Sequence, residues 1–300
     1  MITPRRLKQL YEQGQNISAC LREELALQQN TREIIELSYD LQAGSYVAAM
    51  HDAEQARLKQ DYTQKIAATI ARLCTPASVL EAGIGEGTTL SGVLAHLPGG
   101  IRSYGFDLSW SRVAYARRWL RSRQIRACTL CSGDLANIPF LENSTDVVFT
   151  SHAIEPNGGN ELAIVRELYR VARRYVVLLE PAYEFASAEV RQRMDAHGYC
   201  RNLKGAAESC GYDVVEHGLF PYTGNPLNPT ALTIIRKEQR GPAPDDVFAC
   251  PRFKTPLQEV AGMLFSPEAL VVYPILDGIP CLRIENGIVA SKFPEIVAQR

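Results

Sequence analysis

A glycine-rich turn between a short apolar run and a helical pattern constrains the fold of this chain more than any other segment. Residues 79–88 read Val-Leu-Glu-Ala-Gly-Ile-Gly-Glu-Gly-Thr, and the glycines let the backbone turn sharply and approach a ligand. The run from Ser78 to Glu81 predicts a buried strand, and Thr88 to Leu97 predicts a helix. The N-terminus of that helix presents unpaired N–H groups to the turn. These features predict a ligand site at the carboxyl end of the first strand of an open α/β sheet.

Strand and helix patterns alternate after this turn. The predicted strands are Ile101 to Leu108, Ala127 to Ser132, Asp146 to Thr150 and Tyr175 to Leu179, and the predicted helices are Trp110 to Gln124, Glu161 to Arg174 and Ala186 to His197. Such alternation implies right-handed crossovers and a parallel sheet that is covered on both faces. The last two strands, Asp213 to Phe220 and Ala231 to Lys237, have no helix between them, which predicts an antiparallel pair. We therefore expect a doubly wound α/β domain with a mostly parallel, seven-stranded sheet whose last strand is antiparallel.

Helical and β-rich segments flank this domain. Amphipathic patterns predict helices from Pro4 to about Gln29, from Thr31 to Leu41 and from Asp52 to Cys74, with Asn30 as a cap. A linker-like stretch, 241–246, precedes short β-rich runs with turn signals. We expect three parts, which are an N-terminal helical lid or extension (1–50), a central ligand-binding domain (51–240) and a small β module (247–300).

The charge and the cysteines exclude several classes of protein. Thirty-two basic and 33 acidic residues give a net charge of −1, so there is no global attraction to nucleic acid or anionic membrane. The N-terminus lacks an apolar signal region, and no apolar run is long enough to span a bilayer. The eight cysteines are scattered, which is typical of reduced thiols. We expect a cytoplasmic protein without membrane contact, and a homodimer remains compatible with the sequence.

Acidic residues end three consecutive predicted strands. Glu81, Asp107 and Asp134 should converge, because the carboxyl ends of parallel strands meet at one edge of a sheet. A dinucleotide fingerprint needs glycine or alanine where this chain has Thr88, and Glu81 would repel a pyrophosphate. Helix capping explains any one acid, but the three acids and the glycines together favour a cationic nucleoside.

The pattern from Glu81 to Gly87 resembles the first motif, E-x-G-x-G-x-G, of the class I S-adenosylmethionine-dependent methyltransferases, which have a Rossmann-like fold. The resemblance covers roughly Met50 to Lys237 and implies an enzyme with S-adenosylmethionine as its cofactor. It also implies how the cofactor is bound: Glu81, Gly83 and Gly85, in the turn that Gly87 completes, hold the methionine part, Asp107 holds the ribose, Leu108 packs on the adenine face, and Asp134 with the Leu135 amide binds the adenine.

The segment after the fourth predicted strand is the candidate for catalysis. The resemblance places Ser151 and the residues after it beside the cofactor and its methyl group. His152 is the predicted general base, because a histidine titrates near neutral pH, and Glu155 is predicted to orient it. A buried histidine bonded for structural reasons is the alternative.

Four further residues are predicted to contact the acceptor. Tyr39 and Tyr46 flank a glycine that interrupts the N-terminal helices, so this segment is predicted to close over the site as a lid. Tyr183 follows the fifth strand, and His197 ends the next helix. An ordinary loop and capping role is the alternative for these last two residues.

The C-terminal module also has a family resemblance. The runs from Ala249 to Leu257 and from Tyr273 to Leu282 resemble the small activator subunit of tRNA and protein methyltransferases. Zinc-binding relatives carry further cysteines where this chain has Phe253 and other residues. Cys250 and Cys281 alone are too few for a closed zinc site, so we expect no metal and a module that packs the fold or docks on the methyltransferase domain.

We therefore predict a methyltransferase that acts on a hydroxyl (or amine) of a small molecule, such as a sugar or biosynthetic intermediate. The absence of N-P-P-Y or D-P-P-Y counts against nucleic-acid amino methyltransferases. The alternative acceptors are tRNA, rRNA or a translation protein, which the activator-like module and the arginines at 117, 118, 121, 123 and 126 favour, although a solvated helix face also explains these arginines. The sequence also leaves open a non-catalytic S-adenosylmethionine-binding scaffold and an NAD-dependent dehydrogenase.

Overall fold

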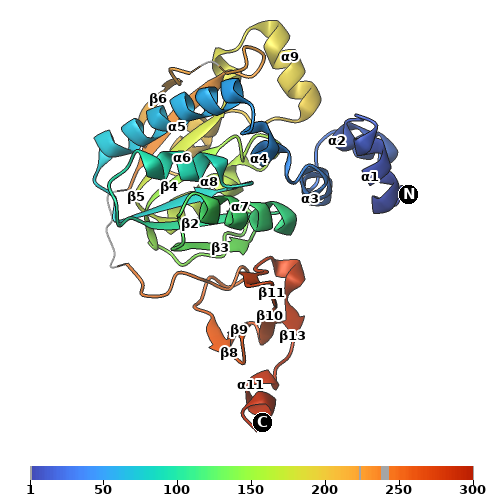
Figure 1. Cartoon of the computed structure of the whole chain (residues 1–300), viewed down its shortest axis with the longest axis vertical. Coiled ribbons are helices and arrows are strands. Elements are labelled where there is room, and N and C mark those ends of the chain that lie inside the picture. Colours follow the sequence, from blue (N-terminus) through green and yellow to red (C-terminus); the bar gives the residue numbers. More distant parts are fainter. Residues whose placement is uncertain (1, 223, 238–242, 300) are drawn as a thin grey trace.

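A seven-stranded sheet forms the centre of the computed structural model, which describes residues 2–222, 224–237 and 243–299 (Figure 1). Its strand order is β3-β2-β1-β4-β5-β7-β6. The strands are β1 (Ser78–Ala82), β2 (Arg102–Asp107), β3 (Cys128–Ser132), β4 (Thr145–Ser151), β5 (Ala172–Pro181), β6 (Asp213–Leu219) and β7 (Thr230–Arg236). Strand β7 is antiparallel to both of its neighbours, whereas the pairs from β3 to β5 are parallel. The predicted fold class is confirmed, and the last strand inserts between β5 and the edge strand β6.

Helices cover both faces of this sheet, which is why β1, β4 and most of β5 are buried. One face packs on α5 (Ala53–Leu73), α6 (Thr88–Ala95) and α7 (Trp110–Ser122), and the other face packs on α8 (Glu161–Val171) and α10 (Leu203–Ser209). Successive strand residues alternate between the two cores: Val79 lies with the first group and Leu80 with the second. None of the helices in the described ranges is long and apolar enough to cross a membrane.

Local capping explains most of the helix boundaries. Helix α5 begins after Asp52, whose side chain accepts hydrogen bonds from two backbone N–H groups, and α7 begins after Ser109, which caps Arg112 N. Helix α9 (Ala188–His197) ends at Gly198 in the left-handed conformation. Helix α8 stops at Val171, earlier than predicted, because the chain enters β5 at Ala172.

The N-terminal segment differs from its prediction. A single helix from Pro4 to about Gln29 is wrong, because the chain forms α1 (Pro4–Glu12) and α2 (Ile17–Glu24) around a turn at Gly14 with a φ of 78°. The N-cap of α3 (Arg32–Leu41) is Thr31 rather than Asn30. The Asn30 side chain instead donates to the carbonyls of Pro156 and His197. A short helix, α4 (Ser45–Ala49), follows.

The C-terminal module is β-rich, as predicted, and packs against the β3 side of the main sheet (Figure 1). It contains β8 (Gln258–Val260), β9 (Met263–Ser266), β10 (Val271–Tyr273), β11 (Ile275–Leu276), β12 (Ile279–Pro280), β13 (Ile288–Val289) and α11 (Phe293–Val297). No helix lies between β3 and β4, a stretch that the structure describes in full. The module covers this part of the sheet instead: Leu282 N donates to Ser132 O at 3.0 Å, and the rings of Phe140 and Phe248 lie 5.6 Å apart. Residues 241 and 242 of the predicted linker lie outside the described residues.

Candidate cofactor and acceptor site

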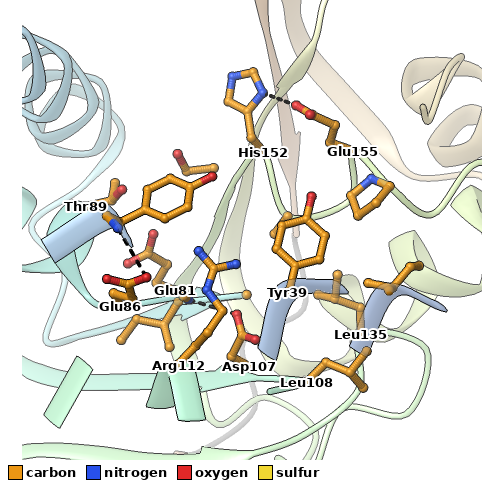
Figure 2. Close-up of a pocket in the computed structure, with 18 of the residues that line it drawn as sticks. Tyr39, Glu81, Glu86, Thr89, Asp107, Leu108, Arg112, Leu135, His152 and Glu155 are labelled. Atoms are coloured by element: carbon orange, nitrogen blue, oxygen red, sulfur yellow. Dashed lines mark hydrogen bonds and ion pairs between the residues drawn. The ribbon is translucent and has the colours of Figure 1, made fainter. Parts of the chain in front are cut away.

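A cavity of about 680 Å³ lies at the carboxyl ends of β1, β2 and β4, and residues of α3 to α5 contribute to its wall (Figure 2). Most of the predicted site residues line it: Tyr39, Tyr46, Glu81, Gly83, Gly85, Asp107, Leu108, Asp134, Leu135, Ser151, His152 and Glu155. A volume of this size is typical of cofactor and small-molecule sites.

Three of the predicted site residues do not line this cavity. Gly87 is the N-cap of α6, and a Cβ built at this position would lie 3.3 Å from Ala116 Cβ. The Tyr183 hydroxyl donates to Asp195 Oδ2 at 3.1 Å. The His197 Nδ1 lies 2.9 Å from Arg193 O, one turn earlier in α9. The prediction that Tyr183 and His197 contact the acceptor is therefore corrected, because both side chains bond to residues of α9 instead.

The glycine turn brings three strand ends close together. Gly83 has a φ of 75°, and a Cβ there would overlap Ala153 Cβ in the loop after β4. Gly85 has a φ of 53°, and its backbone N–H donates to Asp107 Oδ2 at 2.9 Å. The turn therefore needs glycine both for its conformation and for its contacts.

The three acids lie at the carboxyl edge of the sheet, as predicted. Glu81 is 1% exposed, and its Oε2 has no hydrogen-bond partner among the described residues. Burial raises the pKa of Glu81 to about 8, although the nearby Lys59 acts in the opposite direction. Asp107 Oδ1 accepts from Ser109 N, and Asp134 Oδ1 accepts from Ala136 N. A buried carboxylate oxygen without a donor is costly, so the Glu81 oxygen suits a ligand that carries an N–H group.

Two cations in the cavity were not predicted. Lys59, on α5, donates from Nζ to Thr89 Oγ1 at 2.9 Å, and burial lowers the pKa of this lysine. Arg112, on α7, is 7% exposed and lies 5.1 and 4.8 Å from the ring centres of Tyr39 and Tyr46. Lys59 sits in an ordinary amphipathic pattern, so nothing marks it in the sequence. Arg112 shares the buried face of α7 with residues four and eight positions later, and this charge on an apolar face was a usable signal.

The N-terminal segment is hydrogen-bonded to the loops that follow β1 and β2. The Glu86 carboxylate accepts hydrogen bonds from the backbone N–H groups of Gly44, Tyr46 and Val47 at 3.0, 3.3 and 2.7 Å. Asp40 Oδ1 accepts from Ser109 Oγ at 2.6 Å. The N-terminal part of the cavity wall is thus bonded to the glycine turn and to the loop after β2.

His152 and Glu155 form a bonded pair at the other end of the cavity (Figure 2). His152 Nδ1 lies 2.6 Å from Glu155 Oε2, and Nε2 lies 2.8 Å from Thr230 Oγ1. Burial alone would lower the pKa of His152, but the hydrogen bond and charge of Glu155 outweigh it and the pKa is raised. The pKa of Glu155 is lowered, since the bonded histidine outweighs its burial. The pair therefore favours an imidazolium beside a carboxylate.

The surroundings of this pair come from distant parts of the chain. Asn228 Nδ2 donates to Glu155 Oε2 at 2.9 Å. Glu180, at the end of β5, accepts from the backbone N–H groups of Ala153 and Glu155, and burial raises its pKa to about 7. The sequence analysis missed Thr230 and Asn228, because only the pairing of β5 with β7 brings Thr230 to His152 and the preceding loop to Glu155.

Comparisons with known proteins agree with this architecture. Residues 79–174 match a family model described as a methyltransferase domain. The structure of magnesium protoporphyrin IX methyltransferase from Synechocystis PCC 6803 with bound SAH is similar, with a TM-score of 0.53 and 16% identity, over 69% of this chain and 100% of that one. Geranyl diphosphate methyltransferase in complex with GPP and sinefungin has a TM-score of 0.51 and 13% identity, over 61% of this chain and 79% of that one. No curated protein sequence matches the chain.

At these identities the solved structures establish a shared fold, and the family model identifies the domain that carries the glycine turn. Residues 79–174 form a methyltransferase domain, and the chain has the Rossmann-like fold of methyltransferases that use S-adenosylmethionine. The observed residues fit this cofactor, because the cavity combines an unpartnered Glu81 oxygen, a close glycine turn and further acids at the strand ends.

Proposed function

We propose that this protein transfers a methyl group to a hydroxyl of a small molecule, such as a sugar or a biosynthetic intermediate, with His152 as the general base. The observation that carries the proposal is the His152–Glu155 pair, which lines the same cavity as Glu81 and Asp107 but lies away from Leu108 (Figure 2). An amine is the second acceptor group that this base would serve.

We assign the cofactor subsites along the strand ends. Asp107 would bind the ribose hydroxyls, since each of its oxygens accepts one backbone N–H bond and keeps a lone pair for a ligand. Leu108 and Leu135 would flank the adenine, with Asp134 accepting from its amino group. Glu81 and the glycine turn would hold the methionine end, and Ser151 would lie beside it. The cofactor supplies an electrophilic methyl group on a positively charged sulfur.

The hydrogen bonds of His152 determine which of its ring nitrogens can accept a proton. Glu155 accepts from Nδ1–H, which leaves Nε2 as the basic atom in neutral imidazole. The acceptor hydroxyl would replace the Thr230 hydroxyl at Nε2. As the acceptor oxygen forms its bond to the methyl carbon and the carbon–sulfur bond breaks, Nε2 takes the hydroxyl proton. Glu155 then stabilises the imidazolium that forms.

The lining of the acceptor end supports a small, uncharged, polar acceptor. Neutral hydrogen-bonding side chains also line this cavity, namely Asn157, Asn160, Tyr222, Asn225 and Asn228, and Asn228 bonds to Glu155. The two similar methyltransferases carry the names of small molecules, magnesium protoporphyrin IX and geranyl diphosphate. Arg117, from the arginine-rich helix, pairs with Asp277 in the C-terminal module, so this part of an RNA track is already occupied.

We also propose roles for the flanking parts. Residues 1–50 would act as a lid, which the bonds to Glu86 support, and residues 51–240 would form the catalytic domain. Residues 247–300 would act as a built-in counterpart of an activator subunit. Cys250 is buried beside the Tyr273 hydroxyl, and no cluster of three or more metal-ligating side chains occurs in the described part of the chain.

A labelling experiment tests the proposed acceptor. The protein is incubated with methyl-labelled S-adenosylmethionine and separated fractions of small metabolites, RNA and protein. We expect label in a small metabolite and its loss in His152→Ala. Label in RNA or protein alone would contradict the proposal, and cofactor binding without turnover in any fraction would favour a scaffold.

A further inference from the structure

Two buried charged groups in the cavity have atoms without a protein partner. Glu81 Oε2 and Arg112 Nε are both buried and make no hydrogen bond among the described residues. The two side chains are 1% and 7% exposed as residues. Unpaired polar atoms of charged groups are expensive to bury, so both atoms point to a ligand with one donor and one acceptor.

The two groups face the same part of the cavity, together with Lys59. The Arg112 guanidinium lies against the glycine turn, where a Cβ built on Gly85 would be 3.1 Å from Nη2. Figure 2 shows this guanidinium between Glu81 and Tyr39, aimed into the pocket. Lys59 approaches from α5 and bonds to Thr89 in the first turn of α6. Glu81 and Asp107 supply two carboxyl groups around the end of β1, and Arg112 and Lys59 supply two cations.

An α-amino acid has the complementary charges. Its ammonium group would donate to the free oxygen of Glu81, and its carboxylate would accept from a guanidinium, which binds carboxylates with two parallel hydrogen bonds. We infer that Arg112 and Lys59 bind the α-carboxylate of the methionine end of the cofactor, opposite the α-ammonium on Glu81. This inference rests on the proposed binding of S-adenosylmethionine at this turn.

The surroundings of Arg112 favour the cofactor over the acceptor as its ligand. The guanidinium contacts the turn after β1, and the charge of Asp107, the proposed ribose ligand, acts on it. Tyr39 and Tyr46 of the lid cover it from the other side. A carboxylate bound to Arg112 would thus lie directly beneath the lid, so the amino acid end of the cofactor is the part that the closed lid encloses.

Two ligands that differ at this end test the inference. S-adenosylhomocysteine carries the amino acid, and 5′-methylthioadenosine has the same nucleoside and thioether without it. Calorimetric titration of the full chain should show at least tenfold tighter binding of S-adenosylhomocysteine. Arg112→Met should weaken S-adenosylhomocysteine by about tenfold or more, as expected for a lost charged hydrogen bond, and should leave 5′-methylthioadenosine unchanged. Lys59→Met should shift affinity in the same direction.

Controls separate binding from folding and from lid closure. Arg118→Met changes an exposed arginine on the same helix and should alter neither affinity. Arg112→Lys keeps the charge but not the planar fork, and it should lie between wild type and Arg112→Met. An equal loss of both ligands in Arg112→Met, or no loss of either, overturns the inference. If the wild-type protein binds both ligands equally, only the carboxylate assignment fails; if it binds neither, the proposed function fails as well.

Discussion

The cofactor end and the acceptor end of the cavity are built in different ways. At the cofactor end, Glu81, Gly83 and Asp107 lie at the tips of adjacent parallel strands, and Gly85 N bonds directly to Asp107. At the acceptor end, His152 bonds to Thr230, which is 78 positions away in the sequence, on the antiparallel strand β7. The first end follows from one compact motif and its neighbour, whereas the second requires the insertion of β7 beside β5. If this contrast is correct, substitutions at the two ends should affect binding and turnover separately.

The largest effect is expected for His152→Ala. If His152 is the general base, as we propose, its loss should lower turnover roughly 10²- to 10⁴-fold, while the affinity for S-adenosylhomocysteine stays the same. Transfer of labelled methyl and calorimetry measure the two quantities. His217→Ala is a matched control, because His217 also bonds to a threonine, Thr233, but does not line the cavity. Unchanged turnover in His152→Ala would remove the base from the mechanism.

Asp107→Asn should instead weaken cofactor binding. One of the two oxygens that accept from Gly85 N and Ser109 N is replaced, and the charge that would bind the ribose is lost. We expect S-adenosylhomocysteine affinity to fall roughly 10- to 100-fold. The melting temperature, measured alongside, would reveal a folding defect. Wild-type affinity in a folded Asp107→Asn protein would contradict the ribose assignment.

A pair of glycine substitutions tests how tightly the cofactor end is packed. Gly83 and Gly211 have φ values of 75° and 74°, but only Gly83 has a neighbour that a Cβ would overlap. Gly83→Ala should lower the free energy of unfolding by about 1–3 kcal/mol, and Gly211→Ala by about 1 kcal/mol or less. Urea denaturation measures both. Equal losses would show that backbone strain alone, rather than contact with the loop after β4, requires Gly83.

The pH dependence of turnover tests the acceptor end. Only neutral His152 can accept a proton, and its pKa is raised, so kcat/KM should fall as pH decreases through that raised value. Glu155→Gln removes the group that raises the pKa, and the acid limb should therefore move to lower pH. The ion pair stabilises the fold between the lowered pKa of Glu155 and the raised pKa of His152, and this contribution is lost outside that window. An acid limb that does not move in Glu155→Gln would show that another group titrates.

The smallest effect is expected for Glu86→Gln. The amide keeps one oxygen for the backbone N–H groups of Gly44, Tyr46 and Val47 but loses the charge. We expect the affinity for S-adenosylhomocysteine to fall about two- to fivefold. Hydrogen exchange at residues 44–47 should become faster. Exchange that does not change would show that the charge of Glu86 is not needed to hold this segment in place.

Much of the cofactor end could be predicted because its signals are local. The apolar strand, the glycine turn and the acid at the next strand end are short-range patterns, and the parallel sheet follows from the alternation of strands and helices. Arg112 was missed although it lies on the apolar face of α7, where a charged residue is unusual. Lys59 has no such signal in the sequence. Tyr183 and His197 were placed in the site from chain order alone, but hydrogen bonds within α9 and the adjoining turn hold their side chains away from the cavity.

The sequence by itself determined the mostly parallel sheet, the succession of strands and helices along the chain, and the acids at the cofactor edge, since these depend on periodicity and on turns of a few residues. Only the tertiary structure decided which side chains meet His152, how the N-terminal segment bonds to Glu86, and where the C-terminal module covers the sheet beyond β3. These contacts join segments far apart in the chain. Their geometry depends on strand pairing and packing, which no local pattern of residues encodes.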